Sequence, residues 1–135
     1  MPFDRKSLPL RPILMADAAA CLVMGIGLIG LAGPLEPLTG LSQTFAMVAG
    51  ALLLPVAAFI LVVASRPAIP AAGVAVIVAG NVGWIAASLL ILATGMVQTT
   101  ALGTTLVLAQ AAAVAVITAL EHAARPARIV GQAAI

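Results

Sequence analysis

The chain has 135 residues, of which 64% are hydrophobic and only 7% are charged. A soluble domain carries about 25% charged residues to keep its surface hydrated, so this composition excludes a water-soluble globular protein. The net charge is +2, and the chain has three Phe, one Trp and no Tyr. These are too few aromatic side chains to stack on bases, so a nucleic-acid-binding surface is not expected. The sequence therefore predicts a single membrane domain over residues 1–135.

Four membrane-spanning helices are predicted in chain order, near residues 13–32, 44–64, 72–93 and 101–121. Charged residues are absent from 18–35, 37–65 and 67–120, and about 20 apolar residues are enough to cross the hydrocarbon core. The segments 33–43, 65–73 and 94–100 contain the Pro, Gly and polar residues that are typical of loops. Because short loops join antiparallel neighbours, we expect an all-α, up-down bundle of four transmembrane helices.

The basic residues predict the orientation of these helices. All six lie on one side of a four-crossing chain: Arg5, Lys6, Arg11, Arg66, Arg125 and Arg128. By the positive-inside rule both termini face the cytoplasm, and we expect a multi-pass protein of the bacterial inner membrane. The apolar stretch that ends at residue 32 is longer than the core of a cleaved signal peptide, which favours a retained first helix.

The first helix contains Gly25, Gly27 and Gly30 in the spacing G-x-G-x-x-G. A dinucleotide site would need a strand before these glycines and an acidic residue about 20 positions after them. Residues 47–53 contain neither Asp nor Glu, and the motif lies inside an apolar helix. We therefore interpret the glycines as positions where another helix backbone comes close.

The third predicted helix has two distinct faces. Small residues repeat every fourth position on one face, at Ala75, Ala79, Gly83 and Ala87. Asn81, Trp84 and Ser88 lie on nearly the opposite face at 100° per residue. Such a helix is either central to its bundle or shared with another subunit, so the stripe is a candidate surface for a homo-oligomer or a larger membrane complex.

Polar residues inside membrane helices are costly and indicate candidate sites. Asn81 and Gln110 lie about halfway along the third and fourth predicted helices. We expect the two amides to face each other, either as a structural clamp of about 0.6 kcal/mol or as part of a solute path.

Asp17 is predicted near the start of the first helix, where its short side chain needs water, a polar partner or a proton. Arg66, Glu121, His122 and Arg125 are predicted at the same cytoplasmic end. One interpretation is a cluster of ion pairs that holds the helix ends, and the other is a carboxylate that binds a proton or cation during transport.

No metal, cofactor or catalytic site is predicted. His122 is the only histidine and Cys21 the only cysteine, which is too few for a metal cage. Glu121 and His122 are consecutive and point about 100° apart on a helix. With no nucleophile beside a base, we expect a protein that is not an enzyme and needs no cofactor.

The four crossings and the stretch GIGLIGLAGPLEPLTGLS resemble small four-helix membrane proteins of bacteria, including DoxX-like families. Small multidrug resistance transporters are similar in size, but they place a glutamate deep in helix 1 among aromatic residues. This chain has Asp17 within ADAAACLVMG instead. Two functions stay open: a structural or accessory membrane subunit, which we favour, and a small proton- or cation-coupled transporter using Asp17, Asn81 and Gln110.

Overall fold

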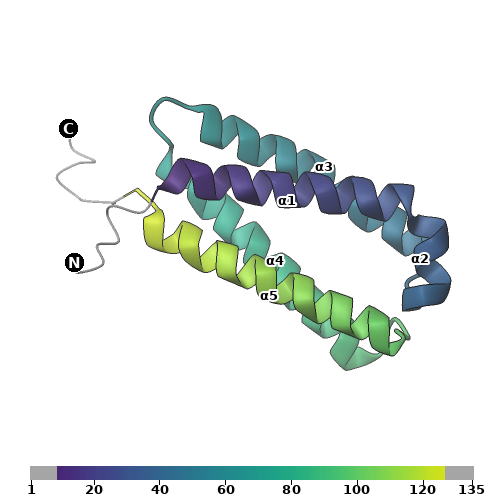
Figure 1. The fold of residues 1–135 in the computed structure, drawn as a ribbon. Helices are drawn as coiled ribbons and strands as arrows, with labels where there is room; N and C mark the ends of the chain where they lie inside the picture. Colours follow the sequence, from purple (N-terminus) through teal and green to yellow (C-terminus); the bar gives the residue numbers. More distant parts are fainter. Residues whose placement is uncertain (1–8, 127–135) are drawn as a thin grey trace.

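The computed structural model describes residues 9–126, which form five α-helices and no strand (Figure 1). The helices are α1 (Leu10–Gly30), α2 (Ala32–Thr39), α3 (Gln43–Ser65), α4 (Ala71–Thr94) and α5 (Ala101–Ala124). All but α2 are long and apolar enough to span a membrane. The prediction of an all-helical membrane protein with four spanning helices is therefore confirmed.

The long helices are arranged as two hairpins. α1 packs along α3, and α4 packs along α5. In Figure 1, α1 and α4 run from one end of the molecule toward the other, and α3 and α5 run back. The hairpins meet chiefly where α1 contacts α5, whereas α3 and α4 touch at few positions although they are consecutive. Space is therefore available between the hairpins.

The helix α2 corrects the expectation of an irregular loop over residues 33–43. Pro34 lies in the first turn, where a missing backbone N–H costs nothing, and the helix ends at Gly40 in a left-handed conformation, φ 80°. The two carbonyls at its end, of Leu38 and Thr39, accept hydrogen bonds of 2.6 and 3.0 Å from the hydroxyl and amide of Thr100. Thr100 also caps the N-terminus of α5. It therefore links the end of α2 to the start of α5 by hydrogen bonds.

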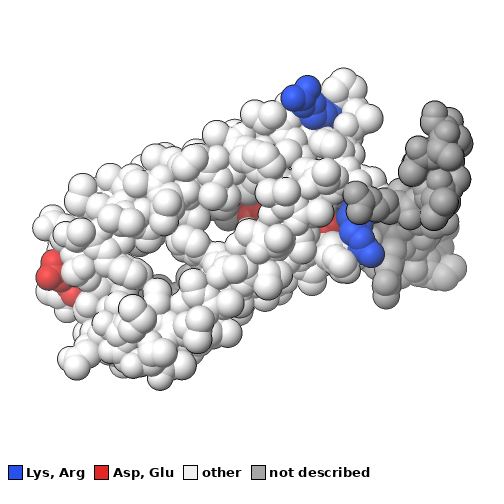
Figure 2. Space-filling model, turned by 180° about the vertical axis from the view of Figure 1, so that it is seen from behind, with Lys and Arg blue, Asp and Glu red and all other residues white. Residues whose placement is uncertain are grey.

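The opposite end of the molecule, which we call the basic end, contains Arg11, Arg66 and Arg125. Arg11 donates to the carbonyls of Ala64 and Arg66 at 2.9 and 2.7 Å, where the end of α3 leaves acceptors without helical partners. Figure 2 shows the basic side chains at this end, while acidic atoms lie at the α2 end and in the crevice between the helices. Three further basic residues from which the membrane orientation is predicted lie outside the described residues: Arg5, Lys6 and Arg128.

Packing is dense toward the basic end and looser toward α2. The core comprises α1, α3 and α4 side chains of the basic half, among them Leu14, Ala18, Ala57, Ile60 and Val74, all with 0% exposure. Toward α2 the surface is hollowed between the hairpins (Figure 2). The loosely packed half is thus the half that can contain cavities.

One of the three glycines in the first helix makes a close backbone contact. A Cβ on Gly25 would lie 3.0 Å from the carbonyl oxygen of Gly50, and a Cβ on Gly50 only 2.6 Å from that of Gly25. Gly27 and Gly30 have open space around them. Within residues 9–126 the structure therefore supports the packing interpretation for Gly25, while no neighbour lies within 4 Å of the place of a Cβ on Gly27 or Gly30.

Candidate functional site

Three helices bring two buried carboxylates onto one amide. The Nδ2 atom of Asn81 on α4 donates to Asp17 Oδ2 on α1 at 2.9 Å and to Glu121 Oε1 on α5 at 3.0 Å. Asp17 is 2% exposed, Asn81 7% and Glu121 0%. We call these three residues the carboxylate cluster.

Asp17 lies deeper in its helix than expected. The prediction began the first helix at residue 13, but α1 begins at Leu10. Pro12 did not prevent this, because proline is tolerated in the first turn of a helix. Asp17 is therefore about 10 Å along the helix axis from the first residue, at 1.5 Å per residue.

The carboxylate cluster has fewer donors than acceptors. Each hydrogen of the Asn81 amide is used by one carboxylate. Cys21 Sγ approaches Asp17 Oδ1 only at 3.9 Å, a weak contact. The second Glu121 oxygen, Oε2, is buried without a hydrogen-bond partner among the described residues. Protonation of Oε2 would remove its charge and convert this oxygen into a hydroxyl that can donate a hydrogen bond.

The expected ion-pair cluster at the helix ends is not what the structure contains. Glu121 points into the bundle toward Asn81, while Arg125 donates to the carbonyl of His122. Arg66, His122 and Arg125 are exposed. Glu121 belongs to the buried face of α5 because it lies three residues after Thr118, which is also buried.

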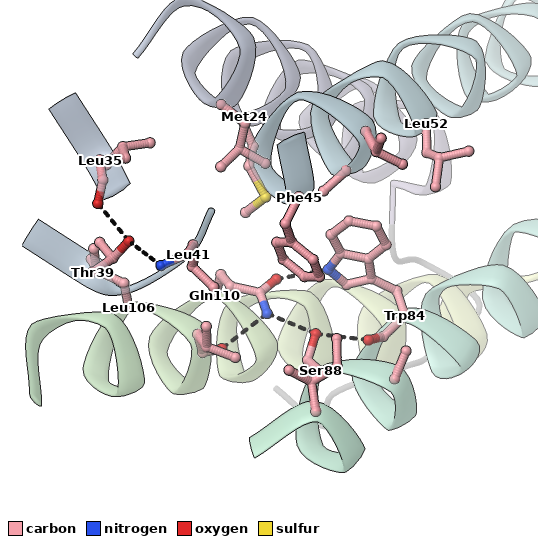
Figure 3. A pocket seen from close by; sticks show the side chains of 16 residues that line it. Met24, Leu35, Thr39, Leu41, Phe45, Leu52, Trp84, Ser88, Leu106 and Gln110 are labelled. Atoms are coloured by element: carbon pink, nitrogen blue, oxygen red, sulfur yellow. Dashed lines mark hydrogen bonds between the residues drawn. The ribbon is translucent and has the colours of Figure 1, made fainter. Parts of the chain in front are cut away.

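Gln110 lies in a second polar group, which corrects the predicted Asn81–Gln110 contact. Its Oε1 accepts from Trp84 Nε1 at 2.8 Å, and its Nε2 donates to Ser88 Oγ at 3.0 Å and to the carbonyl of Val107 at 2.9 Å. Trp84, Ser88 and Gln110 form the glutamine cluster (Figure 3). Asn81 is one helical turn from Trp84 and faces α1 and α5 instead.

Two cavities lie between the hairpins. The α2-side cavity has a volume of about 410 Å³ and is bounded by α2 residues Leu35 and Thr39. The carboxylate-side cavity has a volume of about 230 Å³ and is lined by Asp17 and Asn81. Both cavities are lined by Met24, Trp84 and Gln110. The glutamine cluster therefore separates the α2-side cavity from the carboxylate cluster.

The small-residue stripe does not make a close helix contact within the described chain. Ala75, Ala79, Gly83 and Ala87 are all exposed, and a Cβ on Gly83 would meet nothing within 4 Å. Ala75 and Ala79 border a third hollow together with His122 and Arg125. Ala87 instead lines the α2-side cavity.

Sequence reasoning selected Asp17, Asn81, Trp84, Ser88 and Gln110, but it grouped Glu121 with the surface charges. The missed signal was periodicity: Ala111, Thr118 and Glu121 are spaced as one face of a helix, and all three are buried. Within residues 9–126, no group of three His, Cys, Asp or Glu side chains could hold a metal ion.

Comparisons of the chain with family models, with curated proteins and with solved structures found no match. The resemblance to DoxX-like proteins therefore has no support from a family model. What the fold and the site define is a class: an all-helical, membrane-spanning protein with a buried carboxylate pair between two helical hairpins.

Proposed function

We propose that this protein is a small, non-enzymatic, proton-coupled transporter in which the carboxylate cluster binds the proton. The observation that supports it is the buried Glu121 Oε2, without a partner among the described residues, beside a second carboxylate that shares the same amide donor. Two ionised carboxylates with one neutral donor between them are costly in a membrane interior. One added proton removes a charge and turns one carboxylate oxygen into a hydroxyl that can donate to a neighbouring oxygen.

A proton suits the carboxylate cluster better than a metal cation does. Asn81 presents its Nδ2, the positive end of the amide, to both Asp17 and Glu121. A cation placed between these carboxylates would meet the amide hydrogens rather than the amide oxygen. A proton on Glu121 Oε2 needs no change in the two existing hydrogen bonds.

The basic end supports the placement that we propose for the termini. Arg11, Arg66 and Arg125 lie at that end, and cytoplasmic loops carry an excess of basic residues. The termini would then be cytoplasmic, in a bacterial cell on the inner membrane, with α2 on the opposite side. The carboxylate cluster would be reached from the cytoplasm and the α2-side cavity from outside.

Infrared titration in lipid tests the proposed proton site. We expect the wild type to show, within about pH 5 to 8, a protonated carboxyl band that is lost as the pH is raised further, because a proton on Glu121 Oε2 removes one of two buried charges. Asp17→Asn and Glu121→Gln should each remove or shift this band. Glu36→Gln is the matched control, since Glu36 is an exposed carboxylate on α2. Carboxylates that stay ionised across this whole range would overturn the proposal.

A second candidate function, a structural or accessory subunit, is favoured by the exposed stripe of small residues on α4. Ala75, Ala79 and Gly83 would allow close approach of a helix from a second copy or from a larger complex. The infrared test separates the two functions, because a packing subunit has no need of a titrating carboxyl group in its interior.

A further inference from the structure

The α2-side cavity has the size and the lining of a small-molecule site. Its volume of about 410 Å³ lies within the range of about 300–1,000 Å³ that is typical of such sites. Side chains from both hairpins line it, including Met24, Phe45, Leu52 and Leu106 (Figure 3). The volume and the apolar walls fit a compact, largely apolar molecule.

The lining also determines the charge of the occupant. Among residues 9–126, no Asp, Glu, Lys or Arg lines the α2-side cavity. An ionised ligand would lie there without a counter-ion, and an unpaired charge in an apolar medium is strongly unfavourable. The occupant is therefore uncharged.

The glutamine cluster specifies one polar group on the occupant. Both hydrogens of Gln110 Nε2 are already donated, to Ser88 Oγ and to the carbonyl of Val107. The single hydrogen of the Ser88 hydroxyl is donated to the carbonyl of Trp84. Gln110 Oε1 and Ser88 Oγ each accept one bond and keep a free lone pair. Each of these two oxygens can therefore accept one more hydrogen bond, from a donor such as a hydroxyl group.

The indole of Trp84 fixes this orientation of the Gln110 amide. An indole N–H can only donate, so the amide group that lies 2.8 Å from Trp84 Nε1 is the oxygen. If the amide were flipped, its Nε2 group would lie against the indole N–H of Trp84, and neither group could accept a hydrogen bond. The acceptor on the cavity side is therefore a consequence of the tryptophan beside it.

We propose that the α2-side cavity binds a small, uncharged, largely apolar molecule with one hydroxyl group, and that the hydroxyl donates to Gln110. This inference rests on the proposed function, of which the molecule is the substrate. Trp84 and Gln110 line both cavities. The bound molecule would therefore lie against the partition that separates it from the carboxylate cluster.

Fluorescence quenching tests this site, because Trp84 is the only tryptophan of the chain. The probe is 2-bromodecan-1-ol, which carries its bromine next to the hydroxyl-bearing carbon and so beside Trp84 when the hydroxyl donates to Gln110; it is added to the full chain in nanodiscs of saturated phosphatidylcholine. We expect saturable quenching that unlabelled decanol reverses. Ala87→Phe should abolish the saturable part, because Ala87 lines the cavity. Ala86→Phe is the matched control, since Ala86 is exposed on the same helix and is not among the lining residues.

Two further variants keep the result interpretable if Ala87→Phe does not fold. Ala49→Leu fills the cavity from α3 and should have the same effect. Gln110→Leu should weaken probe binding roughly three- to tenfold, the effect of one lost neutral hydrogen bond. Non-saturable quenching that is equal in all variants would overturn the proposal. Saturable quenching by phosphatidylcholine brominated on its acyl chains, but not by the alcohol, would assign the cavity to lipid and overturn it too.

Failure of this inference can be distinguished from failure of the proposed function. Asp17→Asn leaves every lining residue of the α2-side cavity in place and should retain saturable quenching. Loss of quenching together with a titrating carboxyl band would refute only the substrate class. Quenching without a titrating band would refute only the proton site.

Discussion

Asn81 is the residue that joins the two carboxylates of the interior. It is 64 residues from Asp17 and 40 residues from Glu121 in the sequence, yet it donates to both. The amide neutralises neither charge, but it provides one donor to each carboxylate. The contribution of Asn81 to the stability of the bundle should therefore depend on whether the carboxylates are ionised.

We expect Asn81→Leu to destabilise the bundle more at pH 8 than at pH 5. Where both carboxylates are ionised, which a higher pH favours, the substitution leaves two buried charges without a donor, a loss of about 1–3 kcal/mol or more. At pH 5 a protonated carboxyl can donate to its neighbour and replace part of the lost interaction. Thermal unfolding in mild detergent, followed by helical circular dichroism, measures the difference between the two pH values.

The matched control is Gln110→Leu on the neighbouring helix. It also removes a partly buried amide, but Gln110 bonds only to Trp84, Ser88 and Val107, none of which titrates. Its effect should be the same at both pH values. Equal pH dependence in the two variants would contradict the assigned role of Asn81.

The hairpin of α1 and α3 depends on close approach of two helix backbones. Gly25 and Gly50 each face the carbonyl oxygen of the other, and Ile29 Cγ1 lies 2.8 Å from the place of a Cβ on Gly50. A side chain at either position must push the helices apart. In a membrane, where apolar burial gives little driving force between helices, such contacts provide much of the packing.

We expect Gly50→Ala to lower the thermal stability of the protein. Overpacking of a tight interior position costs about 1–3 kcal/mol, more than the gain of about 1 kcal/mol in helix propensity. Gly27→Ala provides the comparison, because Gly27 lies on α1 with nothing within 4 Å of the place that the new methyl group would occupy. That variant should be neutral or slightly more stable; a loss equal to that of Gly50→Ala would refute the close-contact argument.

The helix α2 illustrates how a neighbour can decide local structure. Its composition, AGPLEPLT, is typical of a loop. The helix nevertheless forms because Thr100 binds its last carbonyls, and Gly103 leaves space for the carbonyl of Thr39. This contact holds α2 where its residues Leu35 and Thr39 line the α2-side cavity.

The whole molecule has an asymmetric distribution of charge and packing. The basic end combines the described arginines with the dense core, and the α2 end combines the cavity with Glu36. This asymmetry predicts which loops face the cytoplasm. Ala68 lies in the α3–α4 loop at the basic end, and Met96 lies in the α4–α5 loop at the other end.

We expect a membrane-impermeant maleimide to label Met96→Cys in intact cells and Ala68→Cys only after permeabilisation. Met96 is 78% exposed, so access does not limit labelling there, and Ala68 is exposed as well. The wild type is the control, because its Cys21 is buried and should not react. Labelling of both variants in intact cells would contradict the four-crossing orientation.

The sequence by itself determined how many helices are long and apolar enough to span a membrane. Hydropathy is summed along a continuous segment, so a run such as residues 37–65 specifies a spanning helix without knowledge of its neighbours. The same reasoning located Asp17, Asn81 and Gln110 as polar groups within apolar helices. These properties are local, and for that reason they could be predicted.

Only the tertiary structure decided which polar groups meet. Asn81 and Gln110 were expected to pair because they have similar depth, but depth does not specify which way a side chain points around its helix. The packing of α1 against α5 turns Asp17 and Glu121 toward Asn81, while Gln110 faces Trp84. Helix rotation and crossing are set by contacts between residues far apart in the chain, so no local pattern contains them.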